Sequence, residues 1–208
     1  MRTVLKFSCV LWLSLSSLSW SYATETKSIP ETFPAQGTVQ VAFSPWDDTQ
    51  ALLIDAIAAA KTQILVQAYL LTSRAIASGL IDARQRGVDV KVMADSRQHE
   101  DTTGSLLNLL EQNNIPVWLE TRYRHAHNKV LLIDVVGRHP VVITGSYNFT
   151  WGAQNLNAEN LLIFRDNRRL TDRYAKNWER HWRQATPYTV SEKNELFRSL
   201  QLMARFIS

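Results

Sequence analysis

The chain has 208 residues, of which 45% are hydrophobic and 20% charged, and its formal net charge is +4. This size and composition are typical of one globular α/β domain and exclude both a disordered low-complexity chain and two full-sized domains. Its single cysteine, Cys9, lies near the N-terminus, within residues 1–23. The rest of the chain therefore cannot use disulfides, thiol catalysis or cysteine-ligated zinc.

Residues 1–23 have the pattern of a secretory signal peptide. Arg2 and Lys6 precede a short apolar run at residues 10–15, and residues 21–23 form a small-x-small cleavage site. The apolar run is shorter than the ~20 residues that cross a bilayer, which favours a signal peptide over a membrane anchor. We expect cleavage after this site and export to the periplasm or beyond. The mature chain would keep 21 basic and 19 acidic residues, a balance too even to identify a partner.

The next segment, residues 24–37, is polar and contains proline, so we expect a flexible lead-in. From residue 38 onward, strand patterns alternate with helix patterns. Apolar or alternating runs predict strands at residues 39–43, 64–70, 88–93 and 116–119, and helical periodicity predicts helices at residues 48–61, 73–86 and 104–113. This alternation predicts an α/β domain with a mixed, largely parallel sheet sandwiched by helices on both faces.

After residue 125 three strands are predicted in quick succession, at residues 130–133, 141–144 and 160–164. A helix over residues 170–183 follows, and its stripe of Leu170, Tyr174, Trp178 and Trp182 is typical of core packing more than of a base-stacking surface. We place the catalytic domain at residues 38–185. Residues 186–208 are predicted as a C-terminal helical extension, with capping-box spacing at Thr189 and Glu192 and an apolar stripe beyond it.

The most informative segment is a His-x-Lys-x4-Asp pattern formed by His127, Lys129 and Asp134. Alone it is weak, since it would arise by chance in about one chain in a hundred of this length. Its context is stronger. His127 and Lys129 stand two residues apart at the start of a predicted strand, so their side chains project from the same face. The apolar residues that follow predict a buried strand that holds both in place.

Further polar residues follow on the next two predicted strands. Ser146 and Asn148 come in a Gly-Ser-x-Asn turn after the first, and Glu159 opens the second within Asn-x-Glu-Asn. Three neighbouring strands would thus bring imidazole, ammonium, hydroxyl, amide and carboxylate groups to one edge of the sheet. Open α/β sheets commonly build their sites at such an edge.

These motifs resemble the phospholipase D superfamily, and specifically its small bacterial endonuclease branch with one motif per chain. The segments at residues 64–69 and 83–92 also look like the second and third strands of that family, so the resemblance covers roughly residues 38–185. It implies the phospholipase D/nuclease fold. It also implies a phosphodiesterase that uses no metal and no other cofactor.

The resemblance assigns roles to the polar residues. His127 would be the nucleophile that forms a covalent phosphohistidine. Lys129 would bind the non-bridging phosphate oxygens, with Ser146 and Asn148 donating further hydrogen bonds. A neutral imidazole suits the first role because its pKa lies near working pH, and positive charge suits the second.

Two carboxylates complete the set that the resemblance implies. Glu159 would hold the far nitrogen of His127 and stabilise the imidazolium, as the carboxylate of a triad does. Asp134 comes with the catalytic motif, and the family suggests for it a structural role that anchors a neighbouring loop more than contact with substrate.

One copy of the motif has a consequence for assembly. In-line displacement puts nucleophile and leaving group on opposite sides of phosphorus, so His127 cannot both attack and protonate the departing oxygen. Larger family members carry two motifs, but here none of the remaining histidines has Lys at +2 and Asp at +7 (His99, His125, His139, His181). We therefore predict a symmetric homodimer with the active site on its twofold axis. The two copies of His127 would titrate as a coupled pair.

Two alternative functions draw on the same residues. A zinc site could use His125 and His127 with Asp95 or Glu159, but Lys129 would repel a cation there. A non-catalytic nucleic-acid-binding module could use the arginines around the motif, although an intact His, Lys and Glu set argues against it. These arginines are Arg122 and Arg124, with Tyr123 between them, and Arg165, Arg168 and Arg169.

The substrate is less sharply indicated than the chemistry. The single-motif form, the flanking arginines and the absence of a long apolar loop for acyl chains favour nucleic acid, with little sequence specificity. Phospholipid, hydrolysed at its head group by the same mechanism, remains the alternative.

Overall fold

The computed structural model describes residues 29–189. The predicted signal peptide and residues 190–208 of the predicted extension lie outside the described residues. The chain divides into two units between residues 32 and 33, and every helix and strand of the described residues belongs to the second unit. In the described part of the chain, no helix has the length and apolar character needed to cross a membrane.

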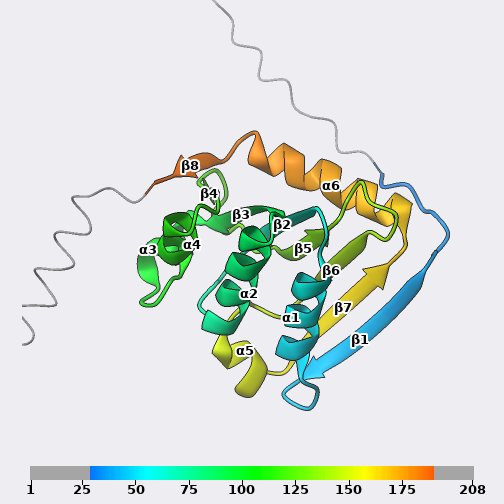
Figure 1. Ribbon diagram of the computed structural model, residues 1–208, viewed down its shortest axis with the longest axis horizontal. Coiled ribbons are helices and arrows are strands. Elements are labelled where there is room, and N and C mark those ends of the chain that lie inside the picture. Colours follow the sequence, from blue (N-terminus) through cyan, green and yellow to red (C-terminus); the bar gives the residue numbers. More distant parts are fainter. Residues whose placement is uncertain (1–28, 190–208) are drawn as a thin grey trace, which may run out of the picture. The chain divides into compact units, whose positions relative to one another are not determined.

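Eight strands form one sheet in the order β1-β7-β6-β5-β2-β3-β4-β8 (Figure 1). Their bounds are β1 Thr38–Ser44, β2 Gln63–Ala68, β3 Asp89–Asp95, β4 Val117–Glu120, β5 Lys129–Ile133, β6 Val141–Gly145, β7 Glu159–Arg165 and β8 Thr186–Tyr188. Strand β2 pairs in parallel with β3, and β3 with β4, whereas the other five neighbouring pairs are antiparallel. The mixed sheet is confirmed, but the expectation that it is largely parallel is wrong.

The reason lies in the second half of the domain. Strands β5 and β6 are joined by residues 134–140 alone, and a connection of that length makes a hairpin, since a parallel crossover needs a dozen residues or more. Strand β7 returns beside β6, again antiparallel, and β1 lies on its far side.

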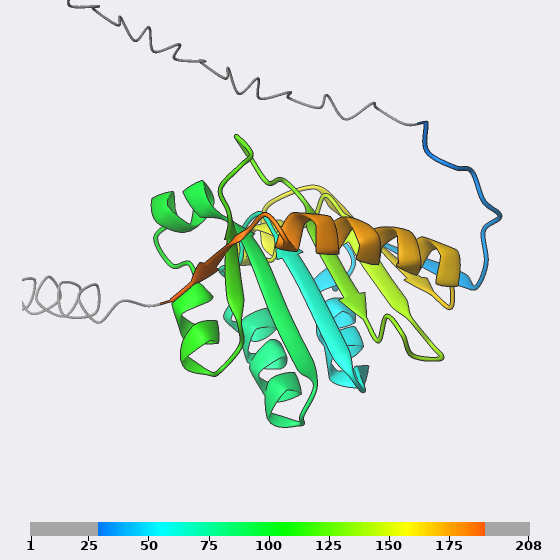
Figure 2. The same cartoon turned by 90° about the horizontal axis from the view of Figure 1, so that it is seen from above.

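Helices cover both faces of the sheet, as predicted. α1 (Thr49–Ala59), α2 (Arg74–Gln85), α4 (Leu107–Gln112) and α5 (Trp151–Asn155) pack on one face, and α6 (Arg168–Trp182) lies across the other (Figures 1 and 2). In β2, Ile64 and Val66 join the core under α1 and α2, whereas Leu65 joins Trp178 of α6 on the opposite face. This alternation follows from the two-residue period of a strand. It makes the domain a three-layer α/β/α structure.

The predicted strands and helices between residues 38 and 183 are all present, with ends shifted by a few residues. Three short elements were not predicted: α3 (Ser96–Asp101), α5 and β8. Strand β8 pairs with β4. Residues 186–188 therefore belong to the sheet, although the sequence placed the end of the catalytic domain before them.

The strand directions define one edge of the sheet as the place of the site. Strands β2, β3, β4 and β6 end at this edge, and β5 and β7, which run the other way, begin there. We call it the site edge, and the other end of these strands the opposite edge. Residues far apart in the sequence lie together at this edge, such as Ala68 at the end of β2 and Lys129 at the start of β5.

Candidate active site

The site is built on strand β5, whose five residues are all buried. His127 lies just before the strand and is exposed, and Lys129 is its first residue and only 5% exposed. Lys129 pairs with Ala68 on β2, and the next residue of β5 pairs with β6, so the start of the strand is fixed on both sides. The prediction that a buried strand holds these two side chains is confirmed.

His127 and Lys129 contact each other directly. Nζ of Lys129 lies 3.0 Å from Nδ1 of His127 and 2.8 Å from the His127 carbonyl oxygen. An ammonium group can only donate, so Nδ1 accepts while Lys129 is charged. The other ring nitrogen, Nε2, has no hydrogen-bond partner in residues 29–189. It is the nitrogen left to meet a substrate.

Tyr69, the residue after β2, supports both groups. Its ring centroid lies 4.2 Å from that of His127, and Nζ of Lys129 stands 4.7 Å from the centroid of the same ring. A cation over an aromatic face is attracted to it, and the effect strengthens where water is excluded. Tyr69 therefore forms one wall of the site and keeps Lys129 beside His127.

Burial lowers the pKa values of both groups. For Lys129, burial is the larger influence and brings the pKa from its ordinary 10.5 to about 8, although the charge of Glu159 acts in the opposite direction. For His127, which is exposed, partial loss of water around the ring lowers the pKa, the charges of Lys129 and His125 lower it further, and Asp95 opposes them. Near neutral pH the imidazole is thus neutral, while the ammonium group is still mostly charged.

Ser146 stands across the site edge on the turn after β6. Its Oγ accepts hydrogen bonds from the backbone N–H of Asn160 at 3.0 Å and from the Asn160 side-chain amide at 3.3 Å. Because both lone pairs are used, its hydroxyl proton is free to be donated to a ligand. Gly145 makes this arrangement possible: its φ is +154°, and a Cβ there would lie 2.2 Å from the Asn160 carbonyl oxygen.

Asn148 is the other predicted donor on this turn. Its Oδ1 is buried and has no hydrogen-bond partner among the described residues. Buried polar atoms are nearly always paired, and an unpaired one marks a place where a water or a ligand completes the structure. Asn148 and Ser146 follow β6, the strand next to β5, as the sequence predicted.

Glu159 begins β7 at the same edge, where its predicted contact with His127 is not formed in this structure. Its Oε1 accepts a hydrogen bond of 3.0 Å from the side chain of Asn157, and it makes none with His127. The place beside Nδ1 is taken by Lys129. The carboxylate still acts on the site through its charge, which raises the pKa of Lys129 and so favours its protonated form.

Asp134 does not lie in the site, which corrects its inclusion among the catalytic residues. It follows the last residue of β5, at the opposite edge, with a φ of +51°. Its carboxylate accepts hydrogen bonds from the backbone N–H groups of Lys61, Thr62 and Gln63 and from the Thr62 hydroxyl, at 2.7–3.2 Å. Burial would raise its pKa, but these hydrogen bonds outweigh burial and lower it. The expected anchoring role is the one the geometry supports.

The arginines divide into two groups. Arg122 and Arg124 are exposed on the loop of residues 121–128, which leads from β4 to His127 at the site edge. Arg165 and Arg168 lie at the opposite edge, where Arg165 bonds to Gln40 and Arg168 donates to the carbonyls of Val135 and Gly137. The second group is therefore structural and cannot line a path to His127.

A zinc site finds no support in the geometry of residues 29–189, where no three His, Cys, Asp or Glu side chains come together as a metal-binding group. His125 instead packs edge-on against Tyr69, with ring centroids 6.3 Å apart. Asp95 uses both carboxylate oxygens on backbone N–H groups, those of Gln98 and Ala126.

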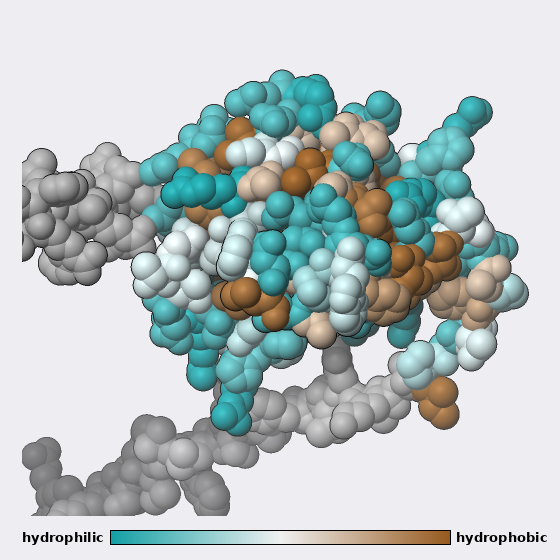
Figure 3. All heavy atoms as spheres, turned by 90° about the horizontal axis from the view of Figure 1, so that it is seen from below, coloured by the Kyte–Doolittle hydropathy of each residue, from teal (hydrophilic) through white to brown (hydrophobic). Residues whose placement is uncertain are grey.

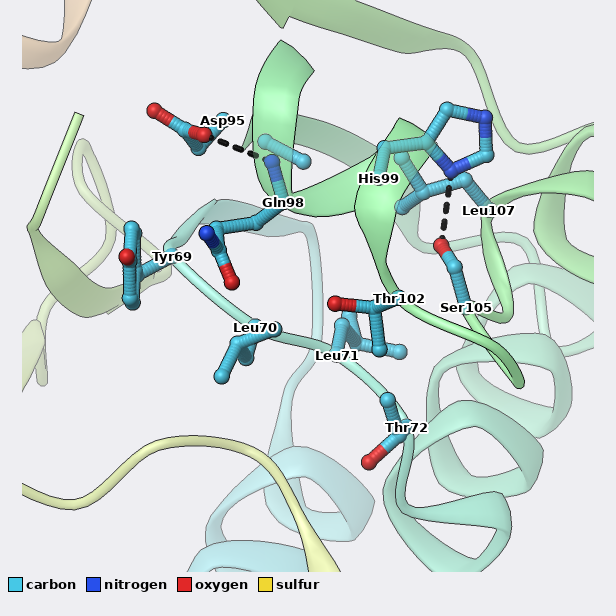
Figure 4. A pocket seen from close by; sticks show the side chains of 11 residues that line it. Tyr69, Leu70, Leu71, Thr72, Asp95, Gln98, His99, Thr102, Ser105 and Leu107 are labelled. Atoms are coloured by element: carbon cyan, nitrogen blue, oxygen red, sulfur yellow. Dashed lines mark hydrogen bonds between the residues drawn. The ribbon is translucent and has the colours of Figure 1, made fainter. Parts of the chain in front are cut away.

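Two residues of the site were not predicted, Tyr69 as a wall and Asp95 as an anchor. Both stand where a central parallel strand ends, and that position was the available signal. They also line a narrow pocket between the ends of β2 and β3 and helix α3 (Figure 4). Its volume of about 10 Å³ holds one water, and neither His127 nor Lys129 lines it. This pocket adjoins the site and is not the site itself.

Comparison with known proteins identifies the family. Residues 53–182 match the family described as "Cardiolipin synthase, PLD-like domain". The phospholipase D of Rickettsia prowazekii is 36% identical over 144 residues, which cover 69% of this chain and 67% of that protein. The mitochondrial cardiolipin hydrolase of Mus musculus is 29% identical over 139 residues, 67% of this chain and 60% of that protein.

A solved structure agrees with these matches. Nuc from Salmonella typhimurium, a phospholipase D family member, superposes with a TM-score of 0.70 at 32% identity and covers 74% of this chain and all of that one. Fold, motif residues and sequence similarity thus point the same way. The chain belongs to the phospholipase D superfamily and is a phosphodiesterase of that superfamily.

Proposed function

We propose that this protein is an exported, metal-independent phosphodiesterase that cleaves nucleic-acid backbones through a covalent phosphohistidine on His127. The observation that carries the proposal is the pairing of His127 with Lys129. A neutral imidazole with one unoccupied nitrogen stands beside a buried ammonium group 3.0 Å away. Nucleophile and phosphate-binding cation are therefore already together.

In the first step, Nε2 of His127 attacks phosphorus, the N–P bond forms and the P–O bond to the leaving alkoxide breaks. For Nε2 to have a lone pair, the ring proton must be on Nδ1. A bound phosphate draws Lys129 toward its oxygens and so releases Nδ1. Nδ1 can then carry the ring proton and donate a hydrogen bond to Glu159. Ser146 donates its free hydroxyl proton to the phosphate, and Asn148 supplies a further polar contact.

The departing alkoxide needs a proton that His127 cannot supply from the attacking side. We assign that proton to His127 of the partner subunit in a homodimer, where the coupled pair has one neutral and one protonated ring and the two sites face each other across the twofold axis. In the second step the same partner imidazole takes a proton from water. The water oxygen bonds to phosphorus, the N–P bond breaks, and its electron pair returns to Nε2.

Nucleic acid is the proposed substrate because Arg122 and Arg124 are exposed on the loop that leads directly into His127. Arginines near the scissile phosphate bind neighbouring phosphates without reading sequence. Phospholipid is the second candidate, and it is favoured by the 36% identity to a protein named phospholipase D.

The test is to incubate the purified mature protein with plasmid DNA and with phosphatidylcholine vesicles, both in EDTA. We expect DNA cleavage that persists in EDTA and disappears in His127→Ala. Hydrolysis of lipid alone would overturn the substrate, and inhibition by EDTA would overturn the mechanism. Acid-labile, alkali-stable phosphate on the protein after a rapid quench with labelled substrate would identify the phosphohistidine.

The homodimer is tested separately with mixed subunits. Wild-type and His127→Ala chains carrying different tags are co-expressed, and the heterodimer is isolated by two affinity steps. If both copies of His127 serve one reaction, the heterodimer is inactive. Half of the wild-type activity would show that each chain works alone.

A further inference from the structure

Two tryptophans are exposed beside the site without a partner in the described chain. Trp46, in the connection from β1 to α1, is 80% exposed, and Trp151, the first residue of α5, is 62% exposed. Both line one broad depression, together with Asp47, Asp48 and Gln154. Exposed single apolar residues are ordinary, but two large aromatic rings over one depression expose an unusual amount of apolar surface.

This surface, residues 45–48 together with α5, is called the aromatic ledge. It is held rigid by Gln154, whose side chain accepts from the Gln50 N–H at 2.9 Å and donates to the Asp47 carbonyl at 2.9 Å. Ser44, at the end of β1, also donates to the Ala153 carbonyl of α5 at 2.6 Å. The two parts of the ledge are therefore fixed to each other.

The aromatic ledge adjoins the site. Ser44 is the partner of Glu159 across β1 and β7, and Trp46 follows it by two residues. Trp151 follows Asn148 by three residues. From the spacing of strands and the rise per residue, Trp46 lies within roughly 12 Å of the Glu159 backbone. That is about the length of one to two nucleotides of an extended strand.

The charges on the two sides of His127 differ. Arg122 and Arg124 stand on the loop that approaches from β4, whereas the aromatic ledge, on the side of β1, carries the carboxylates of Asp47 and Asp48. Carboxylates repel a phosphate backbone and accept hydrogen bonds from the amino groups of bases. Tryptophan rings stack on any base.

We propose that the aromatic ledge binds unpaired bases next to the scissile phosphate, so that the enzyme prefers single-stranded nucleic acid. This inference rests on the proposed function and names its substrate class more closely. The backbone on one side of the cleaved bond lies on Arg122 and Arg124, and bases on the other side stack on Trp46 and Trp151. A duplex offers the ledge only phosphates, which Asp47 and Asp48 repel.

A lipid surface fits the ledge less well. Membrane insertion needs a contiguous apolar face, preferably with cations around it. Figure 3 shows hydrophilic and hydrophobic residues intermixed on the lower side of the molecule, with the largest hydrophobic group toward its right side. Ser44 faces α5, and neighbouring residues of a strand point to opposite faces of the sheet. The exposed apolar residues of β1, such as Phe43, therefore project from the face away from α5 and the aromatic ledge.

The experiment measures cleavage of a labelled single-stranded oligonucleotide, its duplex, phosphatidylcholine vesicles and bis(p-nitrophenyl) phosphate. The variants are Trp46→Ala, Trp151→Ala, the double variant and the double Trp→Phe variant, with Val136→Ala as control. Val136 is 87% exposed and lies at the opposite edge. We expect KM for the single strand to rise about 5-fold in each single variant and about 30-fold or more in the double, with kcat nearly unchanged. The Phe variant and Val136→Ala should behave as wild type.

The small substrate separates this inference from the function on which it rests. Cleavage of bis(p-nitrophenyl) phosphate that depends on His127 but not on either tryptophan supports the phosphodiesterase and shows that the variants fold. An unchanged KM for the single strand in the double variant would overturn the ledge proposal alone. Loss of vesicle hydrolysis in the same variant would assign the ledge to lipid and also overturn it. Asp47→Asn should increase duplex cleavage relative to single-strand cleavage.

Discussion

The carboxylate of Asp95, 1% exposed at the end of β3, accepts a hydrogen bond of 2.6 Å from the backbone N–H of Ala126, the residue before His127. Its other oxygen accepts from the Gln98 N–H at 2.8 Å and so caps α3. One buried carboxylate therefore fixes the end of the loop that carries the histidine. Its charge also raises the pKa of His127, against burial and the nearby cations.

Asp95 is accordingly a positioning residue, and Asp95→Asn should lower kcat by about 10- to 100-fold while most of the protein stays folded. The asparagine has only one oxygen, so its NH2 group faces one of the two backbone N–H groups, of Gln98 or Ala126, and cannot accept from it. Loss of the charge should also lower the pKa of His127, so the acid limb of the pH–rate profile moves to lower pH. A purely structural role would not move that limb. Asp101→Asn, at the exposed end of α3, is the control and should change neither quantity.

The buried charge of Lys129 should support activity and lower the stability of the fold. Lys129→Met should remove activity by about 10²-fold or more because the phosphate loses its buried cation. The same change should raise the free energy of unfolding at pH 7 by about 1 kcal/mol, since a charged group is no longer held in a buried position. His127→Ala, at an exposed position, should remove activity with little change in stability.

The stability difference between Lys129→Met and the wild type should decrease as pH rises. The pKa of Lys129 is about 8 in the folded protein and 10.5 ordinarily. Between these values the unfolded chain binds more protons, so the stability of the wild type rises with pH relative to Lys129→Met. Urea unfolding at neutral pH and again well above the folded pKa should show the difference between the two proteins shrinking. Wild-type kcat/KM should fall above the folded pKa as the ammonium group is lost. A constant difference in stability would contradict the lowered pKa.

Asp134 should act on stability and not on chemistry. Asp134→Ala leaves three backbone N–H groups of the α1–β2 connection without their acceptor, and we expect a loss of about 2–4 kcal/mol in the free energy of unfolding. Because its pKa is lowered, this stabilisation is present above the unfolded value of 3.8 and is lost as pH falls through the lower folded value. Asp55→Ala, on the exposed face of α1, should be neutral. Activity per folded molecule should match the wild type at low temperature.

Two glycines form a matched pair. Gly145→Ala would place a Cβ 2.2 Å from the Asn160 carbonyl oxygen at a φ of +154°, so the turn must shift and carry Ser146 with it. We expect a loss of about 2 kcal/mol or more in stability and a large fall in kcat. At Gly152, inside α5, a Cβ meets nothing within 4 Å. Gly152→Ala should raise stability by about 0.5–1 kcal/mol and leave cleavage of bis(p-nitrophenyl) phosphate, which does not reach the aromatic ledge, unchanged. Equal behaviour of the two variants in thermal unfolding would contradict the geometry.

The local pattern of the sequence was sufficient for the elements and for part of the site. The two-residue period of strands placed His127 and Lys129 on one face, and the buried run after them predicted β5. Ser146, Asn148 and Glu159 were correctly expected at the same edge, because each begins or follows a strand next in the chain. These inferences needed only spacing and polarity within a few tens of residues.

Only the tertiary structure decided which groups contact one another. Asp134 belongs to the same motif as His127 but bonds to residues 61–63, because a five-residue strand separates the two ends of the motif. Tyr69 contacts His127, and Asp95 bonds to the residue before it, because β5 inserts beside β2. This strand order follows from packing of distant segments and leaves no local signal. Lys129 lies beside Nδ1, where Glu159 was expected. It stands only two residues from His127, and its ammonium group is held against the ring of Tyr69. Periodicity sets the face on which a side chain lies, and the partners on that face depend on contacts between strands far apart in the chain.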